Sequence, residues 1–259
     1  MTAIYPEFKG KVAIITGAAD GIGRATAVAF ARNGVRVVVA DVNEAGAKET
    51  VSIITETGGE ALFQHCDVTV DRQNSELVAF AIEKFGSIDY AFNNAGITSP
   101  KVPTDQHSEE LVDRLLAINV KGVWSAMRHQ IPAMLAQGGG AIVNTASILA
   151  IVGLAGRSAY AASKAGVVGM TRVAAVEYAA QNIRVNVICP GTTETGMFRP
   201  LLEEFAQQPE MLQNIRAQQP INRWGQPSEL AEPVLWLCSE GASYVIGHAL
   251  VVDGGYTLR

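Results

Sequence analysis

Cysteine is scarce in this sequence, and no two cysteines lie close together. The 259 residues include three, Cys66, Cys189 and Cys238, and none belongs to a C-x-x-C pair. An odd number of widely spaced cysteines argues against a disulfide framework. We therefore expect reduced, mostly buried thiols, no bound metal and a cytoplasmic protein.

Blocks of basic residues and long apolar runs are also missing. The net charge of −5 is spread along the chain, so neither nucleic acid nor an anionic membrane is an expected partner. The N-terminus lacks the charged and apolar regions of a signal peptide, and every apolar run is shorter than the ~20 residues of a membrane span. The hydrophobic content of 48% is instead enough for the core of one α/β domain covering 1–259.

Short apolar segments alternate with longer segments of helical pattern along the chain. The predicted strands are 11–16, 36–40, 61–65, 88–92, 141–146, 183–189 and 249–252. The predicted helices are 22–33, 43–57, 71–85, 108–134, 159–180 and 227–239, with a looser segment at 192–219. This alternation indicates an α/β fold, a doubly wound parallel sheet with helices on both faces. Ligands bind such sheets at the carboxyl ends of the strands, where the sequence places Thr16, Asp41, Asp67, Asn93, Ser147 and Pro190.

A glycine-rich turn follows the first predicted strand. Gly17, Gly21 and Gly23 form G-x-x-x-G-x-G before a helix, a pattern that allows a tight turn and lets backbone N–H groups meet a pyrophosphate. The spacing departs from G-x-G-x-x-G, so an ordinary turn is the alternative interpretation.

Asp41 lies 18 residues past Gly23, at the end of the second predicted strand. A carboxylate there can accept hydrogen bonds from an adenosine ribose diol and would repel a 2′-phosphate, which favours NAD over NADP. A helix N-cap or a solvated loop aspartate is the alternative, and Arg24 and Arg36 are close enough in sequence to keep NADP open.

Tyr160 and Lys164 are four residues apart in an alanine-rich helical segment. Residues at this spacing share one helix face, and a nearby cation lowers the pKa of a phenol, so Tyr160 could serve as a general acid/base. The alternative is a surface tyrosine over a solvated lysine.

The motifs T-G-x-x-x-G-I-G, N-N-A-G, a serine after the fifth strand, Y-x-x-x-K and P-G occur in this order. With them the chain resembles the short-chain dehydrogenase/reductase family from about 11 to 255. The resemblance implies a Rossmann-type sheet of seven strands in the order 3-2-1-4-5-6-7. It also implies hydride transfer between a nicotinamide and a secondary alcohol or ketone.

By matching position, the resemblance assigns four residues to the chemistry. Tyr160 would exchange a proton with the substrate oxygen, and Lys164 would lower the pKa of that phenol and hold the nicotinamide ribose. Ser147 would hydrogen-bond the substrate oxygen, stabilising alkoxide charge. Asn119 would support a water chain from Lys164 to solvent, or simply bond to nearby backbone.

The resemblance also implies a cofactor site along the carboxyl edge. Besides Tyr160 and Lys164, its expected residues are Gly17, Asp20, Gly21, Ile22, Gly23, Asp41, Val42, Asp67, Val68, Asn93, Asn94, Ala95, Gly96, Pro190, Gly191, Thr193 and Thr195. Two of them depart from the family pattern. Asp20 replaces a common Ser or Asn and would be awkward near pyrophosphate unless it caps the helix facing away, and Thr193 replaces a common aliphatic residue.

The substrate wall is expected from residues after Ser147 and from a lid within 192–219. Its candidates, besides Ser147 and Tyr160, are Leu149, Val152, Gly153, Arg157, Met197, Phe198 and Leu201. An apolar, movable lid fits a small cyclic or aliphatic alcohol, although Arg157 could pair with a carboxylate. The alternative is that the apolar side chains of 194–202 only cover the core.

The predicted helix 159–180 is apolar or small almost all round, which indicates burial on several sides. The resemblance implies a homotetramer built from this helix, the helix before it and the C-terminal strand. Two other functions stay open. A 3-oxoacyl-carrier-protein reductase would favour NADPH, against which Asp41 argues, and a non-catalytic nucleotide-binding regulator would not be expected to keep Tyr160 and Lys164.

Overall fold

The computed structural model describes residues 5–199, 203 and 207–258. Within these ranges, seven parallel strands form one sheet in the predicted order, β3-β2-β1-β4-β5-β6-β7. The strands are β1 (Val12–Thr16), β2 (Arg36–Asp41), β3 (Ala61–His65), β4 (Tyr90–Asn93), β5 (Gly140–Thr145), β6 (Ile183–Pro190) and β7 (Ala249–Val252). Each begins and ends within two residues of its predicted limits.

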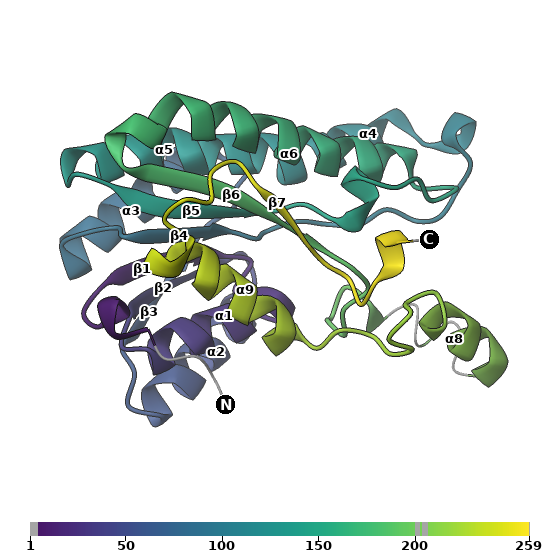
Figure 1. Cartoon of the computed structure of the whole chain (residues 1–259), viewed down its shortest axis with the longest axis horizontal. Coiled ribbons are helices and arrows are strands. Elements are labelled where there is room, and N and C mark those ends of the chain that lie inside the picture. Colours follow the sequence, from purple (N-terminus) through teal and green to yellow (C-terminus); the bar gives the residue numbers. More distant parts are fainter. Residues whose placement is uncertain (1–4, 200–202, 204–206, 259) are drawn as a thin grey trace.

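Helices cover both faces of this sheet (Figure 1). One face carries α1 (Gly21–Arg32), α2 (Glu44–Glu56) and α9 (Pro227–Cys238). The other carries α3 (Asp71–Phe85), α5 (Gly122–Ala136) and α6 (Ser158–Tyr178). The predicted doubly wound architecture is therefore confirmed.

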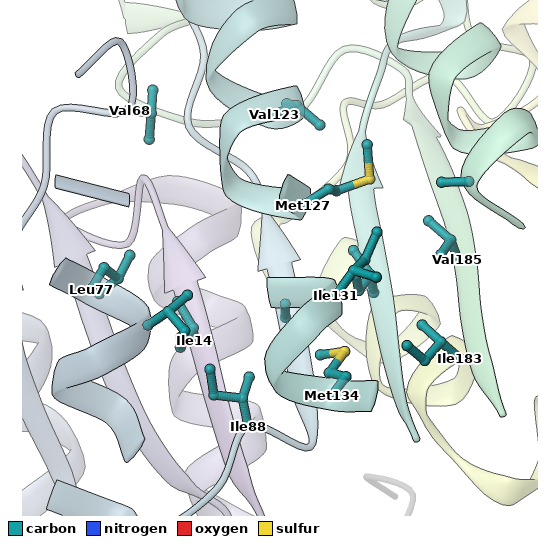
Figure 2. Packing of buried hydrophobic residues seen from close by; sticks show 14 of the residues in the cluster. Ile14, Val68, Leu77, Ile88, Val123, Met127, Ile131, Met134, Ile183 and Val185 are labelled. Atoms are coloured by element: carbon teal, nitrogen blue, oxygen red, sulfur yellow. The ribbon is translucent and has the colours of Figure 1, made fainter. Parts of the chain in front are cut away.

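The two hydrophobic cores follow from the period-2 alternation of side chains along a strand. In β1, Val12 and Ile14 belong to the core under α3, α5 and α6, whereas Ala13 and Ile15 belong to the core under α1 and α9. Figure 2 shows Ile131 of α5 within the first of these cores. Burial of one such Ile or Val side chain contributes roughly 1.5–3 kcal/mol, so both cores stabilise the sheet that carries the site.

β1 lies between β2 and β4, and the winding direction of the sheet reverses there. Thr16, its last residue, pairs with Ala40 of β2 on one side and with Asn93 of β4 on the other. This is the switch point at which open α/β sheets bind ligands.

The predicted helix 108–134 is interrupted in the structure. It comprises α4 (Glu109–Leu115), a π-helical turn η3 (Leu116–Lys121) and α5. The wider turn leaves Asn119 fully buried, with its amide bonded to the backbone of Ile97 on a neighbouring segment. A π-turn of this kind is rare and is often found at functional sites.

The looser segment 192–219 follows β6 and contains α8 (Pro209–Arg216). The predicted lid residue Leu201 lies outside the described residues. The three cysteines are buried and unpaired, as predicted. Among the described helices, none combines the length and the apolar character that crossing a membrane requires.

Candidate active site

A cleft of about 1150 Å³ opens along the carboxyl edge of the sheet. Its wall includes most of the predicted cofactor residues: Gly17, Asp20, Gly21, Ile22, Asp41, Val42, Asp67, Val68, Asn94, Ala95, Gly96, Pro190, Gly191, Thr193 and Thr195. It also includes Ser147, Leu149, Arg157, Tyr160, Lys164, Met197 and Phe198. Gly23, Asn119 and Gly153 do not line it. Residues from seven separate segments thus meet at one edge, as the position of the strand ends predicted.

The glycine turn is packed too closely for side chains. Gly17 has a φ of +64°, and a Cβ there would lie 2.8 Å from Cα of Ala95. A Cβ on Gly23 would collide with the carbonyl oxygen of Gly17. The Asn94 side-chain amide donates to that same oxygen at 3.0 Å and fixes the turn against β4.

The first turn of α1 opens at this glycine turn. Asp20 occupies its N-cap position but makes no capping hydrogen bond, so the first N–H groups of the helix have no side-chain cap. Free N–H groups at a helix start fit a pyrophosphate. The Asp20 carboxylate instead packs against Gly196, and Thr195 packs on Gly21, where a Cβ would lie 2.9 Å from the threonine methyl. The loop after β6 therefore closes over the glycine turn.

Asp41 is fixed at the end of β2 by two backbone groups. Its Oδ2 accepts from the N–H of Ala19 and its Oδ1 from the N–H of Asn43, both at 2.9 Å. The N-cap of α2 is Asn43, so Asp41 does not cap that helix. Each oxygen keeps a lone pair for a diol, which suits the ribose-binding role.

Both arginines that the sequence places near Asp41 already have partners in the structure. Arg24 donates to the carbonyl of Ala19 and forms an ion pair with Glu49. Arg36 begins β2, at the opposite end from Asp41, with its guanidinium over the ring of Phe85. Of the two valines predicted to contact the cofactor, Val42 is exposed and Val68 is buried.

Ser147 and Tyr160 come together beside β5. Ser147 is buried and caps a short 3-10 turn, accepting a hydrogen bond from the N–H of Leu149 at 3.2 Å. Tyr160 lies in the first turn of α6, and a hydrogen bond joins it to the Ser147 side chain. Lys164 is one turn further along, buried, and donates to the carbonyl of Thr145 at 2.9 Å.

Burial dominates the electrostatics of this cluster. It raises the pKa of Tyr160 above its ordinary value, and the hydrogen bond from Ser147 and the positive charge of Arg157 oppose that rise. Burial also lowers the pKa of Lys164 to about 8. The Lys164 ammonium lies 5.9 Å from the centre of the phenol ring, and the Arg157 guanidinium is a second cation whose charge acts on the phenol, a role the sequence did not indicate.

Asn119 lies behind the wall of the cleft, next to Lys164. A Cβ on Gly96 would lie 3.1 Å from Oδ1 of Asn119 and 3.2 Å from Nζ of Lys164, so Gly96 separates the two. The Asn119 amide exchanges hydrogen bonds with the backbone of Ile97 at 2.9 and 3.0 Å and donates to Ser163. These contacts match the backbone-bonding alternative, and the proton-relay role stays a prediction.

The predicted substrate residues divide into two groups. Leu149 and Met197 line the cleft, and Phe198 does so while packing edge-on against the buried Trp224, with ring centres 4.7 Å apart. Gly153 is exposed, with nothing within 4 Å of an added Cβ, and so stands away from the wall.

Several residues of the substrate end were missed by the sequence motifs. They are Ile97, Thr98, Lys101, Arg114, Leu154, Ile215, Gln218 and Tyr256. They come from loops and helix ends without a periodic pattern, and the hydrogen bond from Val102 N–H to the carbonyl of Gly156 is what brings Lys101 beside the start of α6. No local signal in the sequence predicts that contact.

Comparison with known proteins points to one family. A family model described as enoyl-(acyl carrier protein) reductase matches residues 17–257. Cyclohexanol dehydrogenase of Acinetobacter sp. (strain SE19) is 43% identical, with 98% of this chain and 97% of that protein aligned. Cis-4-hydroxycyclohexanecarboxylate dehydrogenase of Sinomonas cyclohexanicum is 42% identical (96% and 98%). A 3-oxoacyl-[acyl-carrier-protein] reductase of Thermotoga maritima is 38% identical (96% and 99%).

Solved structures agree with the sequence comparisons. The crystal structure of levodione reductase superposes with a TM-score of 0.93 at 36% identity, covering 97% of this chain and 99% of that one. A putative NAD(P)-dependent gluconate 5-dehydrogenase from Beutenbergia cavernae, with bound NADP, gives 0.89 at 35% identity, covering 97% and 98%. The seven-stranded sheet and the Ser147–Tyr160–Lys164 cluster at its carboxyl edge agree with these comparisons. The chain belongs to the short-chain dehydrogenase/reductase family, whose members are oxidoreductases that use a nicotinamide cofactor to interconvert alcohols and carbonyl compounds.

Proposed function

We propose that this protein is an NAD-dependent dehydrogenase of a small cyclic secondary alcohol. The observation that carries the proposal is the continuity of the cleft. It joins the Asp41 carboxylate at one end to the Ser147–Tyr160 pair at the other.

The residues present fit a dinucleotide. The turn Gly17–Gly23 and the uncapped start of α1 would hold the pyrophosphate, and Asp41 would bind the adenosine ribose diol. Lys164 would hold the nicotinamide ribose, next to the Pro190–Gly191 turn. A Cβ on Gly191 would lie 2.7 Å from Cα of Asp253, so that turn is also held close to the sheet. A bound nicotinamide would supply the acceptor for the hydride that leaves the carbon bearing the hydroxyl.

The side chains at the other end manage the proton. The Ser147 hydroxyl would donate a hydrogen bond to the substrate oxygen, and Oη of Tyr160 would accept the proton of the substrate hydroxyl. Burial opposes formation of the phenolate, so the reaction depends on groups that lower the pKa of Tyr160. Ser147 and Arg157 do so in this structure, and the Lys164 ammonium one turn away would add to them.

NAD rather than NADP is proposed because Asp41, at the end of β2, would lie beside the adenosine ribose. Its carboxylate would repel a 2′-phosphate, and both nearby arginines are engaged elsewhere. A cyclic substrate is supported by the apolar side chains of the wall, Ile148, Leu149, Leu154, Met197 and Phe198. It is also supported by two of the relatives described above, which are named for alcohols on cyclohexane rings.

A homotetramer is proposed from the apolar faces that α5 and α6 leave open. Trp124 is 47% exposed on α5, and Val173 and Val176 are 57% and 82% exposed on α6. Apolar patches of this kind mark interfaces. The buried, unpaired cysteines suit a reducing compartment such as the cytoplasm, which is the proposed location.

Initial rates followed by NADH and NADPH absorbance test the proposal. The panel contains cyclohexanol and a linear secondary alcohol with NAD or NADP, and a 3-oxoacyl thioester with NADH or NADPH. We expect the highest kcat/KM for cyclohexanol with NAD. A preference for the thioester with NADPH would instead identify a 3-oxoacyl-carrier-protein reductase.

A further inference from the structure

The charged residues of the cleft are segregated by sign. Its acidic lining residues, among those the structure describes, are Asp20, Asp41 and Asp67, all at the cofactor end. The substrate end carries three cations, Lys101, Arg114 and Arg157, in addition to Lys164. A low-dielectric cleft lined by one sign of charge concentrates ligands of the opposite sign.

After Lys164, Arg157 is the least exposed of these cations. It occupies the N-cap position of α6, three residues before Tyr160, and is half-buried. Its charge reaches the phenol, where it lowers the pKa of Tyr160. A group bound to Arg157 would therefore lie on the Tyr160 side of the cleft.

The guanidinium of Arg157 is only partly used by the protein. Nη1 donates to Oγ1 of Thr98 at 3.0 Å and to the carbonyl of Ser99. Nε and Nη2 make no hydrogen bond to any residue in the described ranges, and no carboxylate there lies within ion-pair distance. The Nε–Nη2 edge is one that a carboxylate can bind in bidentate fashion.

A half-buried cation without an anionic partner is costly. This cost is seen in the pKa of Arg157, which burial lowers. A neutral hydrogen-bond donor at this position would bond to Thr98 and Ser99 without the cost of burying a charge. An anion supplied by the substrate would offset the cost during turnover. In such a complex the apolar side chains of the cleft would contact the substrate ring, and Arg157 would contact an anionic substituent on that ring.

We infer that the cyclic alcohol carries a carboxylate, which is bound by the free edge of Arg157. Lys101 and Arg114 are exposed and attract the anion from outside without fixing it. This inference rests on the proposed function and narrows its substrate class.

The test compares 4-hydroxycyclohexanecarboxylate with its carboxamide, which has the same ring and nearly the same shape but no charge. We expect the wild-type kcat/KM to favour the carboxylate by about tenfold or more, as a charge-assisted pair predicts. Arg157→Gln and Arg157→Lys should bring that ratio towards one. Gln removes the positive charge, whereas Lys keeps the charge but loses the bidentate edge. Arg157→Lys should therefore retain more of the preference for the carboxylate than Arg157→Gln.

Lys84→Gln is the matched control. Lys84 is an exposed cation at the C-terminal end of α3, paired with Glu83 and remote from the cleft wall. Removing it should leave the wild-type ratio unchanged. A ratio near one in the wild type, or equal loss in Arg157→Gln and Lys84→Gln, overturns the inference.

Binding without chemistry separates this inference from the proposed function. Cyclohexanecarboxylate and cyclohexanecarboxamide have no hydroxyl to oxidise, and calorimetric titration of the enzyme with each measures recognition alone. Tighter binding of the acid, lost in Arg157→Gln, supports the inference even where no ring alcohol is turned over. Equal binding of acid and amide overturns it, while turnover of cyclohexanol with NAD would leave the proposed function standing.

Discussion

The two ends of the cleft are built in different ways. The cofactor end consists of strand ends and tight turns, where Gly17 and Gly23 leave no room for side chains and Asn94 and Asp41 bind backbone groups. The substrate end consists of side chains from loops and helix termini, such as Lys101, Leu154 and Tyr256. Backbone geometry fixes the first end, and residue identity alone decides what the second end binds.

Tyr160 lies where the two ends meet, and its removal should have the largest effect. Tyr160→Phe deletes the proton acceptor, so kcat should fall on the order of 10³-fold, within the range for general acid–base catalysis. NADH binding, measured by fluorescence titration, should persist because Phe keeps the aromatic ring and only the hydroxyl is lost. Tyr178→Phe, at the other end of α6, is the matched control. A Tyr160→Phe enzyme with more than a tenth of wild-type kcat would exclude the proposed proton transfer.

Lys164 belongs to both ends, and its burial costs stability. A lysine with a folded pKa of about 8 and an unfolded value near 10.5 binds fewer protons when folded between those pH values. Stability therefore rises with pH across this window, and the full cost, about 3 kcal/mol, is present below pH 8. Part of it is offset by the hydrogen bond to Thr145.

Lys164→Met should consequently stabilise the cofactor-free protein by about 2 kcal/mol at pH 7. The gain should shrink as the pH rises from 8 towards 10, as measured by urea unfolding. Lys48→Met, which removes an exposed lysine of α2, provides the comparison and should show no such trend. If Lys164→Met is less stable than the wild type at pH 7, the contacts of the Lys164 ammonium stabilise the fold by more than its burial costs, and the prediction is wrong.

The contrast between the two ends also explains what the sequence could predict. Strand order, the glycine turn and the Ser147–Tyr160 pair depend on local patterns, and the structure brings these residues together. The π-turn around Asn119 was not predicted, and the hydrogen bonds of Asn119 to Ile97, a residue 22 positions earlier in the chain, are contacts that no local pattern reports. The effect of Arg157 on Tyr160 depends on burial, which no spacing rule reports.

Asp41 tests the cofactor end alone. Asp41→Ala removes the acceptor of the ribose diol and the repulsion of a 2′-phosphate, so the preference for NAD over NADP should fall about tenfold, the worth of one charge-assisted hydrogen bond. The kcat/KM values for both cofactors with one alcohol give this ratio. Glu44→Gln, an exposed acid in the first turn of α2, should leave it unchanged. An unaltered ratio in Asp41→Ala would show that selectivity comes from elsewhere in the cleft.

The smallest effects are predicted for substitutions of Gly153 and Leu149, near the substrate end of the cleft. The sequence placed both on the substrate wall, but Leu149 lines the cleft whereas Gly153 is exposed with open space around it. Gly153→Ala should therefore change kcat/KM for a cyclic alcohol by less than about twofold, since surface substitutions have effects within ±0.5 kcal/mol. Leu149→Ala should raise KM by at least about fivefold, because even one methylene in an apolar pocket is worth roughly 1–3 kcal/mol. If Gly153→Ala has the larger effect, the loop after Ser147 must move onto the substrate during turnover, and the wall of the substrate end is completed only when the ligand binds.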